Sequence, residues 1–220
     1  MSYFWQVWLL VTSKDVPVDG LSVLLAGSDR TQPKFKTKQC VGNTMNSATN
    51  SNPVLLVHGI NDTAAIFSKM APQLARKGWR VHDIDLTPNN CDRPLDYLAK
   101  QIANYVEKTF PPEQPFDIVG FSMGGIVSRY YVQRLGGINR VQRFITVSSP
   151  HHGTVLAYLL ERPGTIQMRP DSHFLADLNR DFAMLERINF TSIWTPFDLM
   201  IMPPTSSQLP VGQDVQVPVP

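Results

Sequence analysis

A serine flanked by glycines has the clearest chemical potential in the sequence. Residues 120–124 are Gly-Phe-Ser-Met-Gly, and they overlap the end of an apolar stretch at 116–121 that has the length and composition of a strand. The residues that follow are typical of a helix. In so sharp a turn from strand to helix, glycines leave room for the backbone, and the serine hydroxyl is held above the sheet. A five-residue pattern alone arises often by chance, but this context favours Ser122 as a nucleophile over an idle turn serine.

Backbone N–H groups near this turn are suited to stabilising negative charge. The helix after Ser122 directs its free N–H groups and the positive end of its dipole toward the serine, and Met123 is expected to donate one N–H to an oxyanion. A second donor is expected from Ile60, in the loop after the predicted strand at 54–57. His58, in the same loop, is interpreted as a core histidine that bonds to the backbone rather than as a catalytic group.

A serine hydroxyl is a poor nucleophile at neutral pH and needs a general base, usually a histidine that a carboxylate orients. Asp198 is the candidate carboxylate, because it follows a predicted strand near 190–194. Where a serine occupies a turn of this kind, the catalytic residues follow one another along the chain in the order serine, acid, histidine. No histidine follows Asp198 in this sequence. We infer from this that the sequence is a truncated product, a fragment of a longer reading frame or a degenerate copy.

Other residues are candidates for the missing role. His151 and His152 follow a neighbouring predicted strand at 141–148, so they are candidate substitute bases on the same edge of the sheet. His82 lies early in a strand and His173 lies near the start of a helix, which makes both poorer candidates. Weaker alternatives to the carboxylate of Asp198, on or before a helix, are Asp171, Asp177 and Asp181.

Strands and helices alternate from residue 53 onward and would position these groups. The apolar periodicity predicts strands at 54–57, 80–86, 116–121, 141–148 and 190–194, and helices at 63–77, 95–109, 122–136 and 172–187. Because parallel strands need crossover connections, this order predicts the α/β class, with a mostly parallel central sheet and helices on both faces. A last strand at 214–219 is expected to be incomplete. Residues 1–52 have no clear period apart from a candidate strand at 21–26, so we expect an extension of unclear structure before a domain at 53–220.

The composition is that of a globular protein. Of 220 residues, 43% are hydrophobic and 17% are charged, which excludes the disordered and collagen-like classes. A net charge of +2 gives no basic patch for nucleic acid. The apolar run at 3–11 is too short for a transmembrane segment and lacks the basic residues that begin a signal peptide, so a cytoplasmic location is the default. Cys40 and Cys91 match no metal or redox spacing, and we interpret them as free thiols in polar loops, with a disulfide between them left open.

Four motifs, taken together and in order, resemble the α/β-hydrolase fold and, within it, the small bacterial triacylglycerol lipases and related esterases. They are Val-His-Gly-Ile at 57–60, Gly-Phe-Ser-Met-Gly-Gly at 120–125, Val-Ser-Ser-Pro-His-His-Gly-Thr at 147–154 and Phe-Asp-Leu-Met-Ile-Met-Pro at 197–203. The resemblance covers residues 53 to about 220. It implies that Ile60 and Met123 donate the oxyanion-hole N–H groups and that Asp198 is the acid. The pair at 61–62, Asn-Asp, departs from the glycines that some relatives carry there.

The residues and the resemblance together predict a serine-dependent carboxylic-ester hydrolase of the lipase or esterase type. It would act on acylglycerols or other lipid esters through an acyl-enzyme, with no metal or organic cofactor. Apolar residues at 155–160 and 199–202 are expected either to line an acyl pocket or to pack in the core. Two alternatives stay open. One is a catalytically impaired, truncated remnant that keeps the sheet as a binding or structural domain, and the other is a thioesterase or other acyl hydrolase on the same fold. The sequence does not fix the acyl chain length or the oligomeric state.

Overall fold

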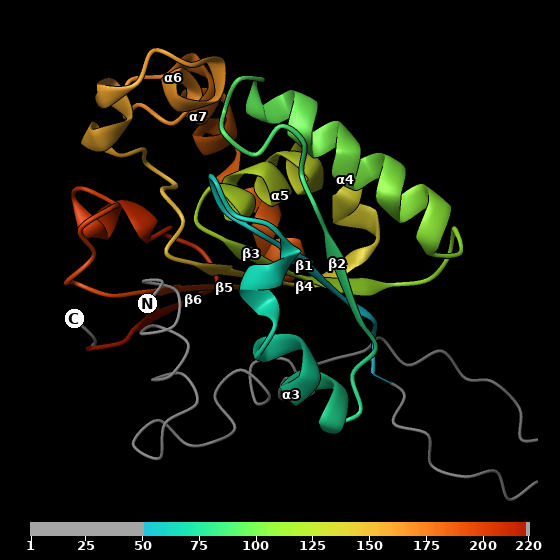
Figure 1. The fold of residues 1–220 in the computed structure, drawn as a ribbon. Helices are drawn as coiled ribbons and strands as arrows, with labels where there is room; N and C mark the ends of the chain where they lie inside the picture. The colour runs from blue at the N-terminus through green and yellow to red at the C-terminus, as the bar shows by residue number, and fades with distance from the viewer. Residues whose placement is uncertain (1–50, 219–220) are drawn as a thin grey trace, which may run out of the picture.

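A six-stranded parallel sheet forms the centre of the protein (Figure 1). The computed structural model describes residues 51–218. The strand order is β2-β1-β3-β4-β5-β6, and every neighbouring pair is parallel. The predicted α/β class is therefore confirmed. The strands are β1 (Val54–Val57), β2 (Val81–Ile84), β3 (Phe116–Phe121), β4 (Val141–Val147), β5 (Asn189–Trp194) and β6 (Gln213–Gln216).

The chain reverses its direction of travel across the sheet between β1 and β3. It goes outward from β1 to β2, returns to β3 on the other side of β1, and then continues outward to β6. In open α/β sheets, ligands bind at the carboxyl ends of the two strands that flank such a reversal. The loop with Ile60 follows β1 and the turn with Ser122 follows β3, so both predicted oxyanion donors lie at this switch point.

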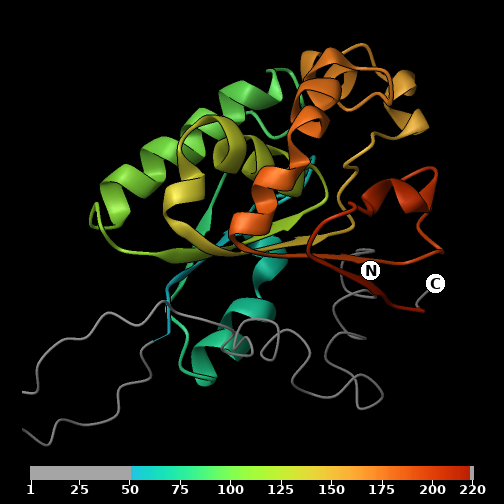
Figure 2. The same ribbon diagram turned by 180° about the vertical axis from the view of Figure 1, so that it is seen from behind.

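Helices cover both faces of the sheet, as Figures 1 and 2 show from opposite sides. One face carries α4 (Leu95–Thr109), α5 (Met123–Arg134) and α7 (His173–Arg180), and the other carries α3 (Met70–Arg76). Alternate residues of a strand serve the two layers: Leu55 packs in the core under α4 and α5, whereas Leu56 packs in the core under α3. Burying each such side chain contributes about 1.5–3 kcal/mol, so the apolar runs in the sequence account for the two-sided sheet.

Helix α4 shows how the sequence pattern produces this layering. Its buried side chains lie three or four positions apart, on one face. The helix begins after Pro94 and ends at Thr109, just before two prolines that cannot continue it. The buried residues of α4 are Leu95, Leu98, Ala99, Ile102 and Val106.

Two predicted helices are interrupted in the structure. The helix predicted at 63–77 is a 3-10 turn, η1 (Ala64–Phe67), followed by α3. Pro72 explains the break, because proline has no N–H for a helix that runs through it but is tolerated in the first turn of a helix that starts at Met70. The helix predicted at 172–187 likewise ends as α7 at Arg180 and continues as the 3-10 helix η4 (Phe182–Arg187).

Other predictions fall at the ends of the chain. The last strand, predicted at 214–219, is β6, which pairs in parallel with β5. The candidate strand at 21–26, the rest of the predicted extension up to residue 50, and Cys40 lie outside the described residues. Between residues 51 and 218, no helix is long and apolar enough to cross a membrane.

Candidate active site

The turn between β3 and α5 holds Ser122 in an unusual backbone conformation. Its φ is +52° and its ψ is −123°, values that residues with a side chain rarely adopt. Two hydrogen bonds fix this geometry: the Ser122 N–H donates to the Val147 carbonyl (2.8 Å), and the Ser122 carbonyl accepts from the Gly125 N–H (3.0 Å). Strained residues of this kind persist where the surroundings over-determine them and are enriched at functional sites.

The glycines around Ser122 are required by close backbone contacts. A Cβ on Gly124 would lie 2.4 Å from the carbonyl oxygens of both Val57 and His58, at the end of β1. A Cβ on Gly120 would lie 2.6 Å from the Cα of Gly125. The motif is therefore a packing requirement, because only glycine lets α5 start directly against the end of β1.

His58 supports the loop after β1 from below. The side chain is completely buried, and its Nδ1 lies 2.8 Å from the Gly59 carbonyl oxygen. Its Nε2 accepts a hydrogen bond from the Leu86 N–H (2.9 Å). Because Nε2 accepts, the ring carries its proton on Nδ1 and donates it to Gly59. The interpretation of His58 as a core histidine bonded to the backbone is confirmed.

The backbone N–H groups of Ile60 and Met123 donate to no other group within the described residues. The loop that carries Ile60 is fixed by its neighbours: the Asn61 N–H donates to the Asn89 carbonyl (2.9 Å), and the Asn89 side chain donates to the Asp62 carbonyl (2.7 Å). Asn61 adopts a φ of +55°, which asparagine tolerates better than most residues. The Asn-Asp pair thus shapes the loop in place of glycines.

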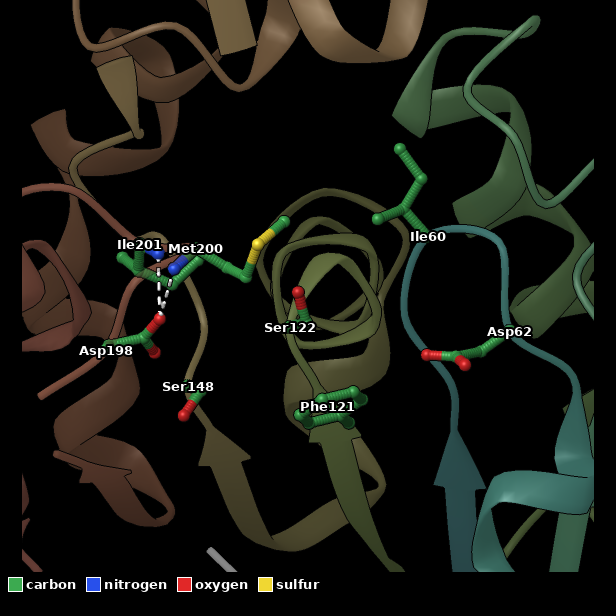
Figure 3. A pocket seen from close by; sticks show the side chains of 8 residues that line it. All are labelled: Ile60, Asp62, Phe121, Ser122, Ser148, Asp198, Met200 and Ile201. Carbon is green, nitrogen blue, oxygen red and sulfur yellow. Dashed lines mark hydrogen bonds between the residues drawn. The ribbon is translucent and has the colours of Figure 1, made fainter. Parts of the chain in front are cut away.

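Asp198 follows β5 and is held by the backbone of its own loop. Its side chain is 2% exposed, and its Oδ1 accepts hydrogen bonds from the N–H groups of Met200 and Ile201, both at 2.8 Å (Figure 3). Hydrogen bonds from N–H groups to a carboxylate favour its charged form. The loop therefore presents an oriented carboxylate.

A cavity of about 150 Å³ brings most of these groups together (Figure 3). The Ser122 hydroxyl lies in its middle, with Ile60 on one side and Asp198 with Met200 on the other. Sequence reasoning missed two polar members of the lining, Asp62 and Ser148. The residues that line the cavity are Ile60, Asp62, Phe121, Ser122, Ser148, Asp198, Met200 and Ile201.

Ser148 has a strained backbone and a buried hydroxyl without a partner. It has a φ of +46° and is 2% exposed, and its Oγ has no hydrogen-bond partner in the part of the chain from 51 to 218. The serine pair after β4 in the sequence is the only signal that could have pointed to it.

The five histidines of the chain all lie within the described residues, and none of them lines this cavity. His151 is completely buried, its Nε2 lies 3.0 Å from the Thr146 Oγ1, and its ring packs edge-on against Phe190. Burial, assisted by the charge of Arg129, lowers the pKa of His151 well below its ordinary value. These contacts speak against a role as substitute base.

The remaining histidines also lie elsewhere. His152 is exposed and lines a separate polar pocket with Gln208 and Asp214. His82, in β2, packs edge-on against Phe110, and His173 is the first residue of α7. The structure therefore brings Ser122, Asp198 and one of the two predicted N–H donors, Ile60, to one cavity but brings no histidine to it.

The weaker candidate acids have structural partners. Arg134, in α5, forms ion pairs with Asp177 (2.8 Å) and Asp181 (2.9 Å) in and after α7. Asp171 accepts a hydrogen bond from the Tyr158 hydroxyl (2.6 Å). None of the three lines the cavity around Ser122.

Cys91 is not in the polar surroundings expected from its neighbours in the sequence. It is completely buried, and its thiol donates to the sulfur of Met123 (3.4 Å). Burial raises the pKa of Cys91 to about 12. The loop after β2 thus folds inward and places this side chain against Met123, one of the two predicted oxyanion donors.

A family model described as the alpha/beta hydrolase fold matches residues 52–191. The chain belongs to this α/β-hydrolase family. The matched residues include the elements that carry Ile60, Ser122 and Met123, and the match ends shortly before the loop that carries Asp198.

Solved structures with the same architecture include enzymes that act on lipids. The mature lipase BlEst2 from Bacillus licheniformis has a TM-score of 0.61 at 17% identity over 76% of this chain and 84% of its own. Aspergillus fumigatus lipase B has a TM-score of 0.65 at 19% identity over 80% of this chain and 47% of its own. The phospholipase PlaB from Legionella pneumophila has a TM-score of 0.58 at 16% identity over 66% of this chain and 38% of its own. The present α/β-hydrolase spans less than half of the two larger proteins, and the likeness at these identities is one of fold.

Proposed function

We propose that this α/β-hydrolase is a serine-dependent carboxylic-ester hydrolase. The observation that carries the proposal is one cavity lined by the strained Ser122, by Ile60 and by the oriented carboxylate of Asp198, with Met123 directly after the serine in the chain. Each of these features has a known use in acyl transfer, and their combination in one site favours that chemistry over a chance arrangement.

In the proposed reaction, the Ser122 Oγ attacks the acyl carbonyl carbon of the ester while a base takes its proton. The carbonyl oxygen becomes an oxyanion that accepts hydrogen bonds from the N–H groups of Ile60 and Met123. Collapse of this intermediate breaks the bond to the alcohol oxygen, which receives the proton from the base, and leaves an acyl-enzyme. Water, activated by the same base, attacks the acyl-enzyme and releases the acid.

None of the histidines of the chain lines the cavity, so none of them supplies the base that this reaction needs. Loss of the histidine alone costs about 10⁶-fold in turnover in a serine protease. In the proposed reaction, an imidazole would occupy the space between Ser122 and Asp198. One of its nitrogens would face the serine hydroxyl and the other would face the carboxylate. Added imidazole provides a direct way to supply it.

Exposed apolar side chains near the cavity favour a lipid ester as the substrate. Three hydrogen bonds tie the Asp198 loop to the start of η3 (Val155–Leu159), through Thr154 and Val155. Leu159 is 77% exposed and Leu199 is 76% exposed, so these two side chains do not pack in the core. We call the exposed set the apolar rim: Val155, Tyr158, Leu159, Leu160, Phe197, Leu199, Met200 and Met202.

The test is hydrolysis of a short-chain p-nitrophenyl ester with increasing imidazole, because this ester reports turnover directly. Imidazole also cleaves such esters by itself, so the rate with the Ser122→Ala variant is subtracted. Ser128→Ala is the matched control, since Ser128 lies on the same helix, is completely buried and has an Oγ without a partner among the described residues. After this subtraction, we expect a saturable, imidazole-dependent rate in the wild type and in Ser128→Ala, because only these two proteins keep the Ser122 hydroxyl. Equal rates in all three proteins would refute the proposal.

A second function, a non-catalytic binding domain, is favoured by the absence of any histidine from the cavity lining. It predicts a folded protein in which the rate at every imidazole concentration is the same for the wild type and for Ser122→Ala. Circular dichroism of the same samples shows whether the protein is folded, so the two functions are separable in one series.

A further inference from the structure

A carboxylate without a partner shares the cavity with Ser122, on the side opposite Asp198 (Figure 3). The Asp62 side chain is partly buried, and no hydrogen bond or ion pair to it occurs within residues 51–218. Its main chain is fixed by the bond from the Asn89 side chain and by a longer contact from its N–H to the Gly59 carbonyl (3.4 Å). The loop, and not a bonding partner, thus holds this carboxylate at the cavity.

Asp62, Phe121 and Ser122 converge at Gly59. The point where a Gly59 Cβ would stand is 3.1 Å from the Ser122 Cβ, 3.3 Å from the Phe121 Cδ1 and 3.4 Å from the Asp62 Oδ2. These distances are too short for an added methyl group, so the missing side chain lets the nucleophile, an aromatic ring and a carboxylate come together at the lining of the cavity. Figure 3 shows the Asp62 carboxylate directed toward Ser122, with the Phe121 ring below.

The electrostatics on the Asp62 side of the cavity favour a positive ligand. Burial raises the pKa of Asp62, and the nearby His58 opposes that shift. A negative charge on Asp62 also disfavours an oxyanion that forms beside it. A cation in the cavity next to Asp62 would relieve both effects, because an opposite charge stabilises a partly buried carboxylate and cancels its field at the oxyanion.

We propose that Asp62 and Phe121 form a subsite for an alkylammonium group carried by the substrate ester. The carboxylate would pair with the charge, and the aromatic ring would contact the N-alkyl groups, an arrangement in which aromatic faces attract cations. Esters with a carboxylate at the same place would be rejected. This proposal names a substrate class for the site in the proposed function, but binding at the subsite does not need catalysis.

The test measures binding in the Ser122→Ala variant by NMR titration. Choline and 3,3-dimethylbutan-1-ol have the same shape, and only choline is charged. We expect choline to bind about fivefold to tenfold more tightly at pH 7. Asp62→Asn should reduce that ratio to about one. Asp85→Asn is the matched control, because Asp85 is an exposed carboxylate that accepts from the Ala64 N–H (2.6 Å), a bond that the new amide oxygen can keep.

Equal binding of the two probes, or a preference that survives Asp62→Asn, would overturn the subsite. A kinetic arm uses imidazole with acetylcholine and 3,3-dimethylbutyl acetate, and compares their kcat/KM ratio in the wild type and in Asp62→Asn. Choline binding that depends on Asp62, without hydrolysis of either ester, supports the subsite and counts against the proposed function. Hydrolysis of both esters with an unchanged ratio in Asp62→Asn supports the function and contradicts the subsite.

Discussion

The two sides of the cavity are built by different means. On the nucleophile side, the end of β1 and the start of α5 meet so closely that a single added carbon on Gly124 collides with backbone oxygens. On the acid side, Asp198 is held by its own loop, and the neighbouring side chains, such as Leu199, extend into solvent. The difference teaches that backbone packing fixes the surroundings of Ser122, whereas on the Asp198 side exposed side chains leave a surface that, in the proposed function, would contact the substrate.

The largest expected effect tests the packing of the nucleophile side. Gly124→Ala should destabilise the fold by more than about 3 kcal/mol, because the new Cβ meets rigid backbone atoms. Gly136→Ala is the control, since nothing lies within 4 Å of its Cβ position and only its φ of +83° opposes alanine, at a cost of about 1 kcal/mol. Urea unfolding followed by circular dichroism measures both. Similar losses in the two variants would show that the close contact is not decisive.

A smaller effect is expected on the acid side. Asp198→Ala removes the acceptor of two N–H groups and should cost about 1–3 kcal/mol of stability. Asp198→Asn keeps an oxygen for them and should cost less than about 1 kcal/mol, while imidazole-dependent hydrolysis falls by about 10²-fold or more, because the charge that orients the imidazole is lost. Unfolding midpoints and initial rates separate the two roles. Full activity in Asp198→Asn would exclude this carboxylate as the acid.

A still smaller effect concerns the pH dependence of stability. Because the pKa of Asp62 is raised, the folded state holds this proton more tightly than the unfolded chain does. Stability from this group is therefore present below the unfolded pKa and is lost as the pH rises through the folded pKa. Asp62→Asn should be more stable than the wild type at pH 7, by less than about 1 kcal/mol since the group is partly exposed. The gain should shrink as the pH falls toward 4 in a series of urea titrations, and a gain that grows instead would contradict the prediction.

The smallest expected effect is at His152. Its ring lies in the separate polar pocket, so His152→Ala should change imidazole-dependent hydrolysis by less than about twofold. A loss similar to that in Ser122→Ala would restore His152 as a base and would require the acid side to rearrange. Steady-state rates at saturating imidazole provide the measurement.

The sequence predicted the strands, the class of fold and the local surroundings of Ser122, because these depend on short apolar runs and on glycines at fixed offsets. It did not predict Asp62 or Ser148 as cavity residues, since each depends on a loop conformation that contacts distant in the chain determine. The apolar residues at 155–160 were compatible with a core or a pocket. Only the tertiary structure shows that Leu159 is exposed.

Cys91 gives the molecule a built-in reporter of loop opening. Its sulfur is sealed behind Met123, and its raised pKa keeps the proton on the thiol at neutral pH. A thiol reagent reaches it only when the loop after β2 opens, and separation of that loop from α5 would also disturb Met123, a proposed oxyanion donor. In a Cys40→Ser background, the alkylation rate of Cys91 would therefore time the fluctuations of the reactive centre, without any substrate.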